Sequence, residues 1–460
     1  MPWHGRSGAR WGLSRRPGRI ITVLVCPLDG VNGADGGLAA NAVWHAVRRR
    51  EGLRARLLPG SPTATLRRDG GLVSLLSRTQ SVGRAWLTEY GADALIWGQR
   101  AGDVLRLSVV GARPRRTAED PLGLHPWSTI QVTMPLSEGA AHLLHTLVLA
   151  AVTPSAAMPE RRRADHRRAL ARALVRAEAL LLEERAPAGE MLQGYRLALG
   201  LAQRAHGLLS GDPVRLARAV RLMETGLDAL AATWPRDLIA LARVDWADAV
   251  LALPEHPESR PATLGAARLD AVVAAYRAAA ARLSPYTMPD TYCAVHVTLA
   301  RALWRVARRD GDAGALDAAL SALTAVAWVW SPETEPARRG VLMEAMKAVL
   351  RDRTARPGGG AGAIRAVLEV VPPHEDSEAW AWARAALGAA LLTADPAPPD
   401  SESEAVEALR EALGVFESVG PPGAADRVRD LLHQAYDAQA RRLAADDLSG
   451  RVVAFQRLRA

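Results

Sequence analysis

The stretch over residues 199–223 recurs, with substitutions, over residues 299–323. The matched residues are Leu199 and Leu299, Gly200 and Ala300, Gly211 and Gly311, and Asp212 and Asp312. The copy keeps two helical patterns and the turn between them in one register, so it predicts a duplicated helix–turn–helix unit. Units of this kind stack into solenoids, whose long surfaces usually bind other molecules rather than catalyse reactions.

A helical stripe recurs through the second half of the chain. Apolar or small residues stand at relative positions 0, 3, 4, 7, 11 and 14, which places them on one face of a helix. The copies start at Leu216, Leu269, Leu316, Ile364 and Ala405. Each copy follows another helical segment, so we expect about five irregular hairpins over residues 190–443, closed by a capping helix over residues 424–444. Helices of a closed bundle would show the same stripe, and that alternative stays open.

Small residues stand beside leucines in the first helix of several pairs. Leu-Gly occurs at 199–200 and 387–388, where a missing side chain lets the two helices of a pair approach closely. This pattern resembles the tetratricopeptide repeat, whose first helix carries Leu-Gly and whose second carries Ala-x3-aromatic-x2-Ala. Ala405, Leu409 and Ala412 match the second helix, with leucine in the aromatic place. The stripe copies lie 41 to 53 residues apart instead of about 34, so the resemblance implies an irregular solenoid with a groove lined by first helices.

The first part of the chain has a different pattern. Residues 20–28 form a nearly continuous run of Ile, Val and Leu, which is typical of a strand buried on both faces. Further strands are predicted at 53–57, 94–97, 104–110 and 129–134, and helices at 38–50, 82–90 and 143–152. This order predicts a small α/β domain with a mixed sheet. The segment GADALIWGQ, followed by GDVLRLSVV, resembles the TolB amino-terminal-like domain. This resemblance implies a recognition or sensing module and provides no catalytic residues to transfer to this chain.

A glycine-rich turn is predicted from Asp29 to Gly37, between the first strand and the first helix. Backbone N–H groups at such a turn can bind a phosphate. The glycine spacing fits neither GxGxxG nor GxxxxGK[ST], and Asp29 and Asp35 would repel a phosphate. We therefore expect a structural turn, with a ligand-sensing regulatory protein as an alternative function.

The formal net charge is +9, and all but one of the 58 Lys and Arg residues are arginines, the exception being Lys347. This charge fits either a solvated basic surface or an acidic partner. No nucleic-acid-binding motif accompanies it, so an arginine-rich nucleic-acid-binding protein remains only an alternative. Two cysteines, Cys26 and Cys293, are too few for a cysteine-rich zinc site and fit a cytoplasmic protein. The apolar runs are shorter than the roughly 20 residues of a membrane helix, so we expect no membrane span.

No sequence motif for catalysis occurs in the chain, which lacks GxSxG, HExxH and CxxC. We therefore expect neither an enzyme nor a cofactor. His142 and His145 lie three residues apart on a predicted helix, but their apolar surroundings favour packing over metal binding. Trp328 and Trp330, at the end of a predicted helix, are also expected to pack rather than stack on a ligand.

These patterns predict an α+β chain with an amino-terminal α/β domain and an all-α helical-hairpin solenoid. The expected parts are a disordered basic arm (1–18), the α/β domain (19–152), a linker and connecting helix (153–189), the hairpin array (190–443) and a tail (444–460). When the Leu-Gly pairs are aligned with those of tetratricopeptide first helices, the resemblance implies that six residues face the groove. They are Arg204, Asp248, Arg301, Trp304, Arg305 and Trp382. A scaffold that holds a protein partner, such as an acidic peptide segment, is the leading hypothesis; the pattern indicates no oligomeric state.

Overall fold

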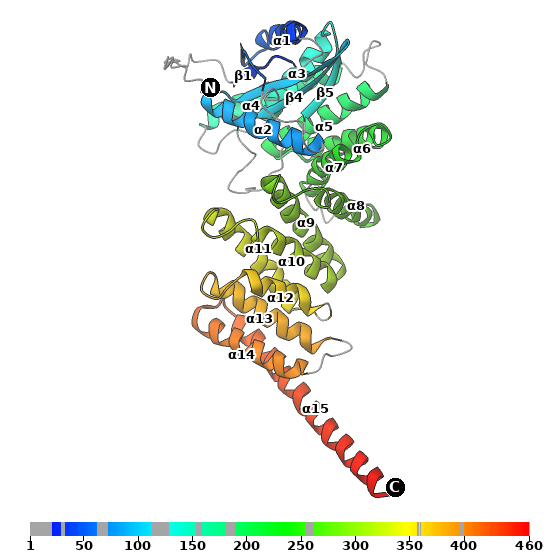
Figure 1. The fold of residues 1–460 in the computed structure, drawn as a ribbon, viewed down its shortest axis with the longest axis vertical. Coiled ribbons are helices and arrows are strands. Elements are labelled where there is room, and N and C mark those ends of the chain that lie inside the picture. The colour runs from blue at the N-terminus through cyan, green and yellow to red at the C-terminus, as the bar shows by residue number, and fades with distance from the viewer. Residues whose placement is uncertain are drawn as a thin grey trace, which may run out of the picture. The chain divides into compact units, whose positions relative to one another are not determined.

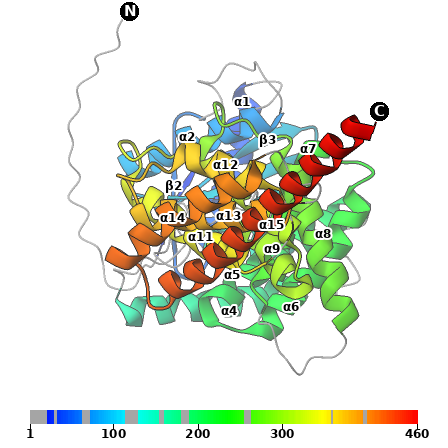
Figure 2. The same ribbon diagram turned by 90° about the horizontal axis from the view of Figure 1, so that it is seen from below.

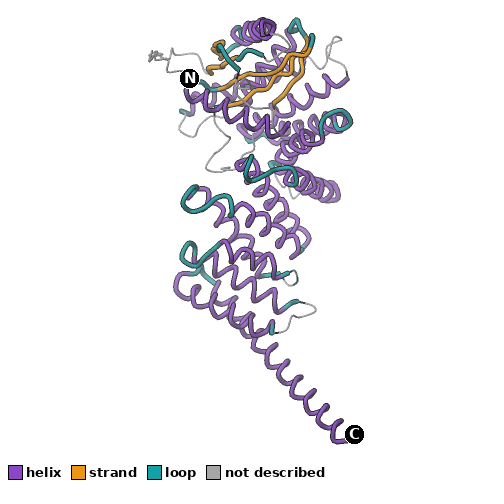
Figure 3. Tube along the Cα trace, in the orientation of Figure 1, coloured by secondary structure: helices purple, strands orange, loops and turns teal. Residues whose placement is uncertain are grey.

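The described residues divide into two compact units, one that ends at residue 253 and one that begins at residue 262. The described strands all lie in the first unit, and the described part of the second is helical (Figure 3). This arrangement confirms the predicted α+β fold. The computed structural model describes residues 21–28, 33–61, 72–112, 128–152, 159–179, 189–253, 262–356, 358, 360–394 and 400–459. The predicted arm over residues 1–18 lies outside these ranges.

A five-stranded sheet organises the first unit (Figure 1). Its strands are β1 (Ile21–Val25), β2 (Leu53–Leu57), β3 (Ala94–Ala101), β4 (Val104–Gly111) and β5 (Ser128–Thr133), in the order β2-β1-β3-β4-β5. β1 pairs in parallel with β2 and β3, whereas β3, β4 and β5 form antiparallel pairs. The mixed sheet expected from the strand and helix order is therefore confirmed.

Helices cover both faces of this sheet. They are α1 (Gly33–Arg48), α2 (Leu72–Glu89) and α3 (Glu138–Ala151). Alternate side chains of β1 point to opposite faces: Val23 joins a core with α1 and α3, and Leu24 joins a second core with Leu87 of α2. Because α1 already begins at Gly33, most of the predicted glycine-rich turn is helical, and residues 29–32 lie outside the described ranges.

The core beside α3 extends into the helices that follow. These are α4 (Glu160–Ala179), α5 (Gly189–Ser210), α6 (Pro213–Leu230) and α7 (Arg236–Leu251). Leu170 and Leu174 of α4 and Tyr195 and Leu199 of α5 belong to the same buried cluster as Val23. Residues 153–189 therefore do not simply connect two domains as expected. The apolar stripe of α4 packs into the first unit despite its many arginines.

The copied unit predicted from the sequence is present. α5 and α6 form one helix–turn–helix, and α9 (Pro289–Asp310) and α10 (Ala313–Ala327) form the other. Gly211 and Gly311 occupy the same place in the two turns, with φ of 65° and 72°, a left-handed conformation that glycine adopts without strain. The next residues, Asp212 and Asp312, cap the second helices by accepting hydrogen bonds from the backbone N–H of Val214 and of Gly314.

The second unit stacks its helices in two layers. Besides α9 and α10, its helices are α8 (Ala262–Ala280), α11 (Pro336–Thr354), α12 (Ala361–Val370), α13 (Ser377–Leu392), α14 (Ser401–Val419) and α15 (Ala424–Arg459). We call α9, α11 and α13 first helices and α10, α12 and α14 second helices. First helix α11 packs against first helix α13, and second helix α10 packs against second helix α12. α15 packs against α13 and α14 at the end of the stack (Figure 2). It continues as helix to Arg459, where a tail was expected from residue 444.

Close approach within a pair depends on glycine, as the Leu-Gly pattern predicted. A Cβ atom at Gly388 of α13 would lie 2.5 Å from Cγ of the fully buried Leu409 on α14. We therefore expect Gly388→Ala to lower the free energy of unfolding by about 1–3 kcal/mol through overpacking. The matched control is Gly414→Ala on the exposed face of α14, where a Cβ meets nothing within 4 Å. There the better helix propensity of alanine should raise stability by about 0.5–1 kcal/mol. Urea denaturation followed by circular dichroism distinguishes these opposite signs, and equal effects would contradict the glycine argument.

Candidate functional site

Three of the six predicted groove residues lie together on α9. Arg301 is exposed, Arg305 is half-buried, and Trp304 lies between them. Arg308, one turn further along, is also exposed and extends the same row of guanidinium groups. The sequence prediction missed Arg308, although its position seven residues after Arg301 could have indicated it.

Trp304 joins α9 to the next first helix. Its indole Nε1 donates a 2.7 Å hydrogen bond to Oδ2 of Asp352 on α11. The guanidinium of Arg308 lies 5.8 Å from the centre of the Trp304 ring, within the range of a cation–π contact. The tryptophan therefore fixes the spacing of two neighbouring helices and supports the arginine row beside it.

A second polar bridge joins α11 to α13. The ammonium of Lys347 on α11 lies 2.6 Å from a carboxylate oxygen of Glu344 and 3.5 Å from those of Asp376 and Glu378. Burial alone would lower the pKa of Lys347, but the Glu344 hydrogen bond and the other two carboxylates raise it above its ordinary value. Lys347 is therefore a charged structural contact between two first helices.

Trp382 is buried next to this bridge and does not line an open groove. Its side chain is 1% exposed, its indole Nε1 donates to Glu378, and its ring packs 4.7 Å from that of Phe416 on α14. The Arg351 guanidinium covers it at 5.4 Å from the ring centre. Trp382 does lie on a first helix, α13, as the Leu-Gly pattern predicted. Its large apolar ring, however, is buried between the two layers of helices instead of facing a groove.

Arg204 and Asp248 belong to the first unit, whereas the other four predicted residues belong to the second. Arg204 of α5 is 4% exposed and lies 2.9 Å from Asp248 and 3.3 Å from Asp245, both on α7. Two carboxylates thus compensate one buried guanidinium. The prediction that Arg204 faces a groove is corrected by this burial, because the group ties α5 to α7.

The two histidines considered as metal ligands, His142 and His145, contact different partners. His145 of α3 is buried, and one ring nitrogen lies 3.1 Å from the carbonyl oxygen of Glu51. His142 contacts the guanidinium of Arg50 and the carboxylate of Glu138. In the described ranges no group of three or more His, Cys, Asp and Glu side chains could hold a metal ion. The burial of His145 confirms packing for that residue.

We define the first-helix face as Arg301, Arg305 and Arg308 of α9 together with Lys347 and Arg351 of α11. On α11, the carboxylates of Glu344 and Glu378 lie close to the two basic groups. Planar guanidinium groups in a row are suited to carboxylates, which they bind through two parallel hydrogen bonds.

Comparison with known proteins adds no family to this description. No protein-family model matches the chain, and no curated protein matches its sequence. The tetratricopeptide and TolB-like patterns therefore remain resemblances. Among the described helices, none combines the length and apolar content that a membrane crossing requires.

Proposed function

We propose that the chain is a non-enzymatic scaffold that holds an acidic segment of a protein partner on its first-helix face. The observation that carries this proposal is the row of Arg301, Arg305 and Arg308 along α9. Arginine is over-represented among the residues that anchor protein interfaces, because its guanidinium binds carboxylates with defined geometry.

Two features of the second unit support the proposal. The Trp304–Asp352 and Lys347–Glu378 bridges hold neighbouring first helices in register, so the arginine row is presented by a fixed surface. The tetratricopeptide resemblance independently implies that first helices contact the partner. Both cysteines are buried and neither forms a disulfide bond, in agreement with the reducing conditions of the cytoplasm.

The test reverses charge on the row in the full chain, because α5 shares its core with the sheet and the helical part cannot be cut out at residue 190. A fluorescein-labelled hexa-glutamate peptide serves as the probe, and its anisotropy reports binding. We expect Arg301→Glu with Arg305→Glu to weaken binding at least tenfold, since two attractive contacts become repulsive. Arg277→Glu with Arg441→Glu makes the same charge change at exposed sites on α8 and α15 and should weaken binding less than twofold.

Equal losses in the two double variants would show that only net charge matters and would reject the first-helix face. Absence of wild-type binding to the acidic peptide would reject the acidic partner. Urea denaturation of both variants verifies that each remains folded.

A further inference from the structure

An open hollow of about 580 Å³ lies on the turn edge of the second unit. It is formed where the turn between α10 and α11 meets the end of α12 and the turn that follows. Its wall and rim include Trp328, Pro332, Glu333, Glu369, Pro372 and His374. None of these residues belongs to the first-helix face.

Trp328 gives the hollow an exposed aromatic wall. Two residues later, Trp330 is 3% exposed and fills the core at the same helix end, whereas Trp328 is 70% exposed. The expectation that both tryptophans pack is thus confirmed for Trp330 and wrong for Trp328. Burial does not account for the indole of Trp328, so its large π surface is available to a ligand.

The floor of the hollow is a fixed polar structure. Arg339 of α11, 5% exposed, forms a bidentate pair with Glu375 at 2.6 and 3.0 Å. It also donates to the carbonyl oxygens of Ala327 and Trp330 at the end of α10 and of Val370 at the end of α12. This buried guanidinium therefore holds both helix ends in place, and its charge is compensated by Glu375.

The rim carries negative charge that the described residues do not compensate by ion pairing. Glu333 and Glu369 are exposed and form no ion pair within the described ranges. The Ser331 hydroxyl, backbone hydrogen bonding and the charge of Arg339 lower the pKa of Glu333 and keep its carboxylate ionised at neutral pH. A chain with net charge +9 thus has an acidic rim beside an exposed indole.

We propose that this hollow binds an arginine side chain of a protein partner. A guanidinium stacks on the face of an indole and binds carboxylates through planar hydrogen bonds, and the wall and rim offer both contacts. The two proline residues give the site a rigid edge. This inference goes beyond the scaffold role proposed for the arginine row, because it assigns a second site with the opposite charge preference.

A fluorescein-labelled tetra-arginine peptide tests the site in the full chain, with tetra-lysine as the comparison. The wild-type protein should bind tetra-arginine saturably and tetra-lysine several-fold more weakly, although its net positive charge repels both. Trp328→Ala should weaken tetra-arginine binding about two- to fivefold, and adding Glu333→Gln and Glu369→Gln should weaken it at least tenfold. All three side chains protrude into solvent, so the variants should remain folded, as urea denaturation can verify.

Matched controls make the same changes elsewhere in the second unit. Tyr286→Ala removes an aromatic side chain that is 93% exposed on the turn before α9. Glu407→Gln with Asp430→Asn removes two exposed carboxylates from α14 and α15. Each control should change tetra-arginine binding less than twofold. Equal losses in site and control variants, or no wild-type binding, would overturn the proposal.

The two proposals can fail separately. The Arg301→Glu, Arg305→Glu variant should keep its affinity for tetra-arginine while it loses hexa-glutamate. The variant with Trp328→Ala, Glu333→Gln and Glu369→Gln should lose affinity for tetra-arginine and keep its affinity for hexa-glutamate.

Discussion

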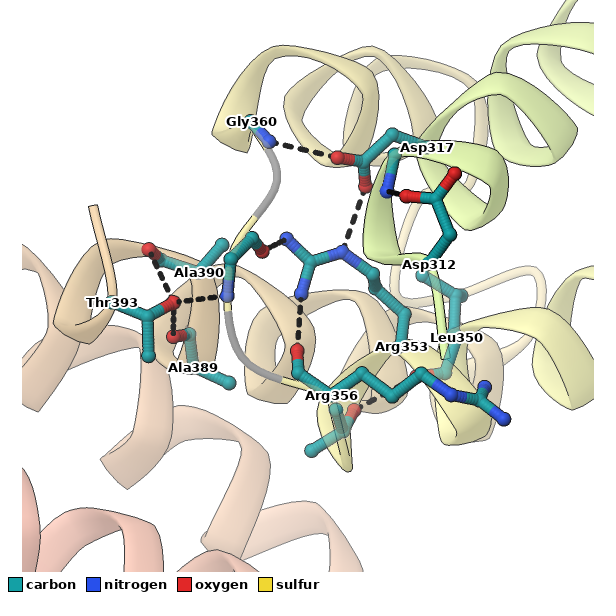
Figure 4. A network of polar contacts seen from close by, with 12 residues as sticks. Asp312, Asp317, Leu350, Arg353, Arg356, Gly360, Ala389, Ala390 and Thr393 are labelled. Carbon is teal, nitrogen blue, oxygen red and sulfur yellow. Dashed lines mark hydrogen bonds and ion pairs between the residues drawn. The ribbon is translucent and has the colours of Figure 1, made fainter. Parts of the chain in front are cut away.

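Replacing Arg353 with methionine should lower the free energy of unfolding by about 3–5 kcal/mol, because it removes one partner of a buried ion pair. Arg353 of α11 has no exposed surface, and its Nε lies 2.8 Å from Oδ1 of Asp317 on α10. Its other nitrogens donate to the carbonyl oxygens of Gly358 and of Arg356, the latter labelled in Figure 4. The other oxygen of Asp317 accepts a hydrogen bond from the N–H of Gly360, just before α12.

The loss should be large because the change removes the Arg353 donor from Oδ1 of Asp317 and from two carbonyl oxygens at a largely buried site. The control is Arg365→Met, which breaks the 2.8 Å pair with Glu404 between α12 and α14. Both partners there are at least 40% exposed, so the expected loss is below about 1 kcal/mol. Urea denaturation followed by circular dichroism measures both variants. A loss below 1 kcal/mol for Arg353→Met would mean that the network contributes little.

Acidification should destabilise the first unit between about pH 6.5 and pH 4. Burial lowers the pKa of His145 and of His166 to about 4, from an ordinary 6.5, and both side chains are at most 3% exposed. Below pH 6.5 the unfolded chain binds protons that the folded chain does not, so stability is complete above 6.5 and falls as the pH drops toward 4. A shift of this size corresponds to ~3 kcal/mol for each histidine.

Hydrogen–deuterium exchange of α3 and α4 amides measures this loss in the first unit separately from the second. Exchange rates give the free energy of opening of these helices. Between pH 7 and pH 4 this free energy should fall by several kcal/mol less in the His145→Gln, His166→Gln variant than in the wild type. His45→Gln with His433→Gln, at exposed positions, should leave the wild-type pH dependence unchanged. The same pH dependence in all three proteins would show that the buried histidines do not cause it.

The elements that follow from local patterns were predictable. The nearly continuous apolar run of β1 identified a strand buried on both faces. The alternating residues of β4 identified another strand, because side chains on a sheet have a period of two. The Gly-Asp pairs at 211–212 and 311–312 identified turns, because a left-handed glycine followed by a capping aspartate is encoded within a few residues. The order of these elements then gave the mixed sheet and the paired helices.

The remaining features depend on distant partners. Arg204 and Arg353 have the local sequence context of exposed helical arginines, and their burial follows from Asp248 and Asp317, 44 and 36 residues away. Trp328 and Trp330 are equally apolar, and only the path of the turn decides which one is buried. The arginines of α4 masked its apolar stripe, so its place in the sheet core was missed.

The core shared by the sheet, α4 and α5 limits how such a chain can evolve or be engineered. Loss of α5 would expose the leucines of α4 and the sheet, so a viable truncation has to retain everything up to Leu253. In the second unit, by contrast, the pairs from α9 to α14 bury their faces against adjacent pairs. Whole pairs can therefore be gained or exchanged there as modules, with α15 kept as the terminal cover.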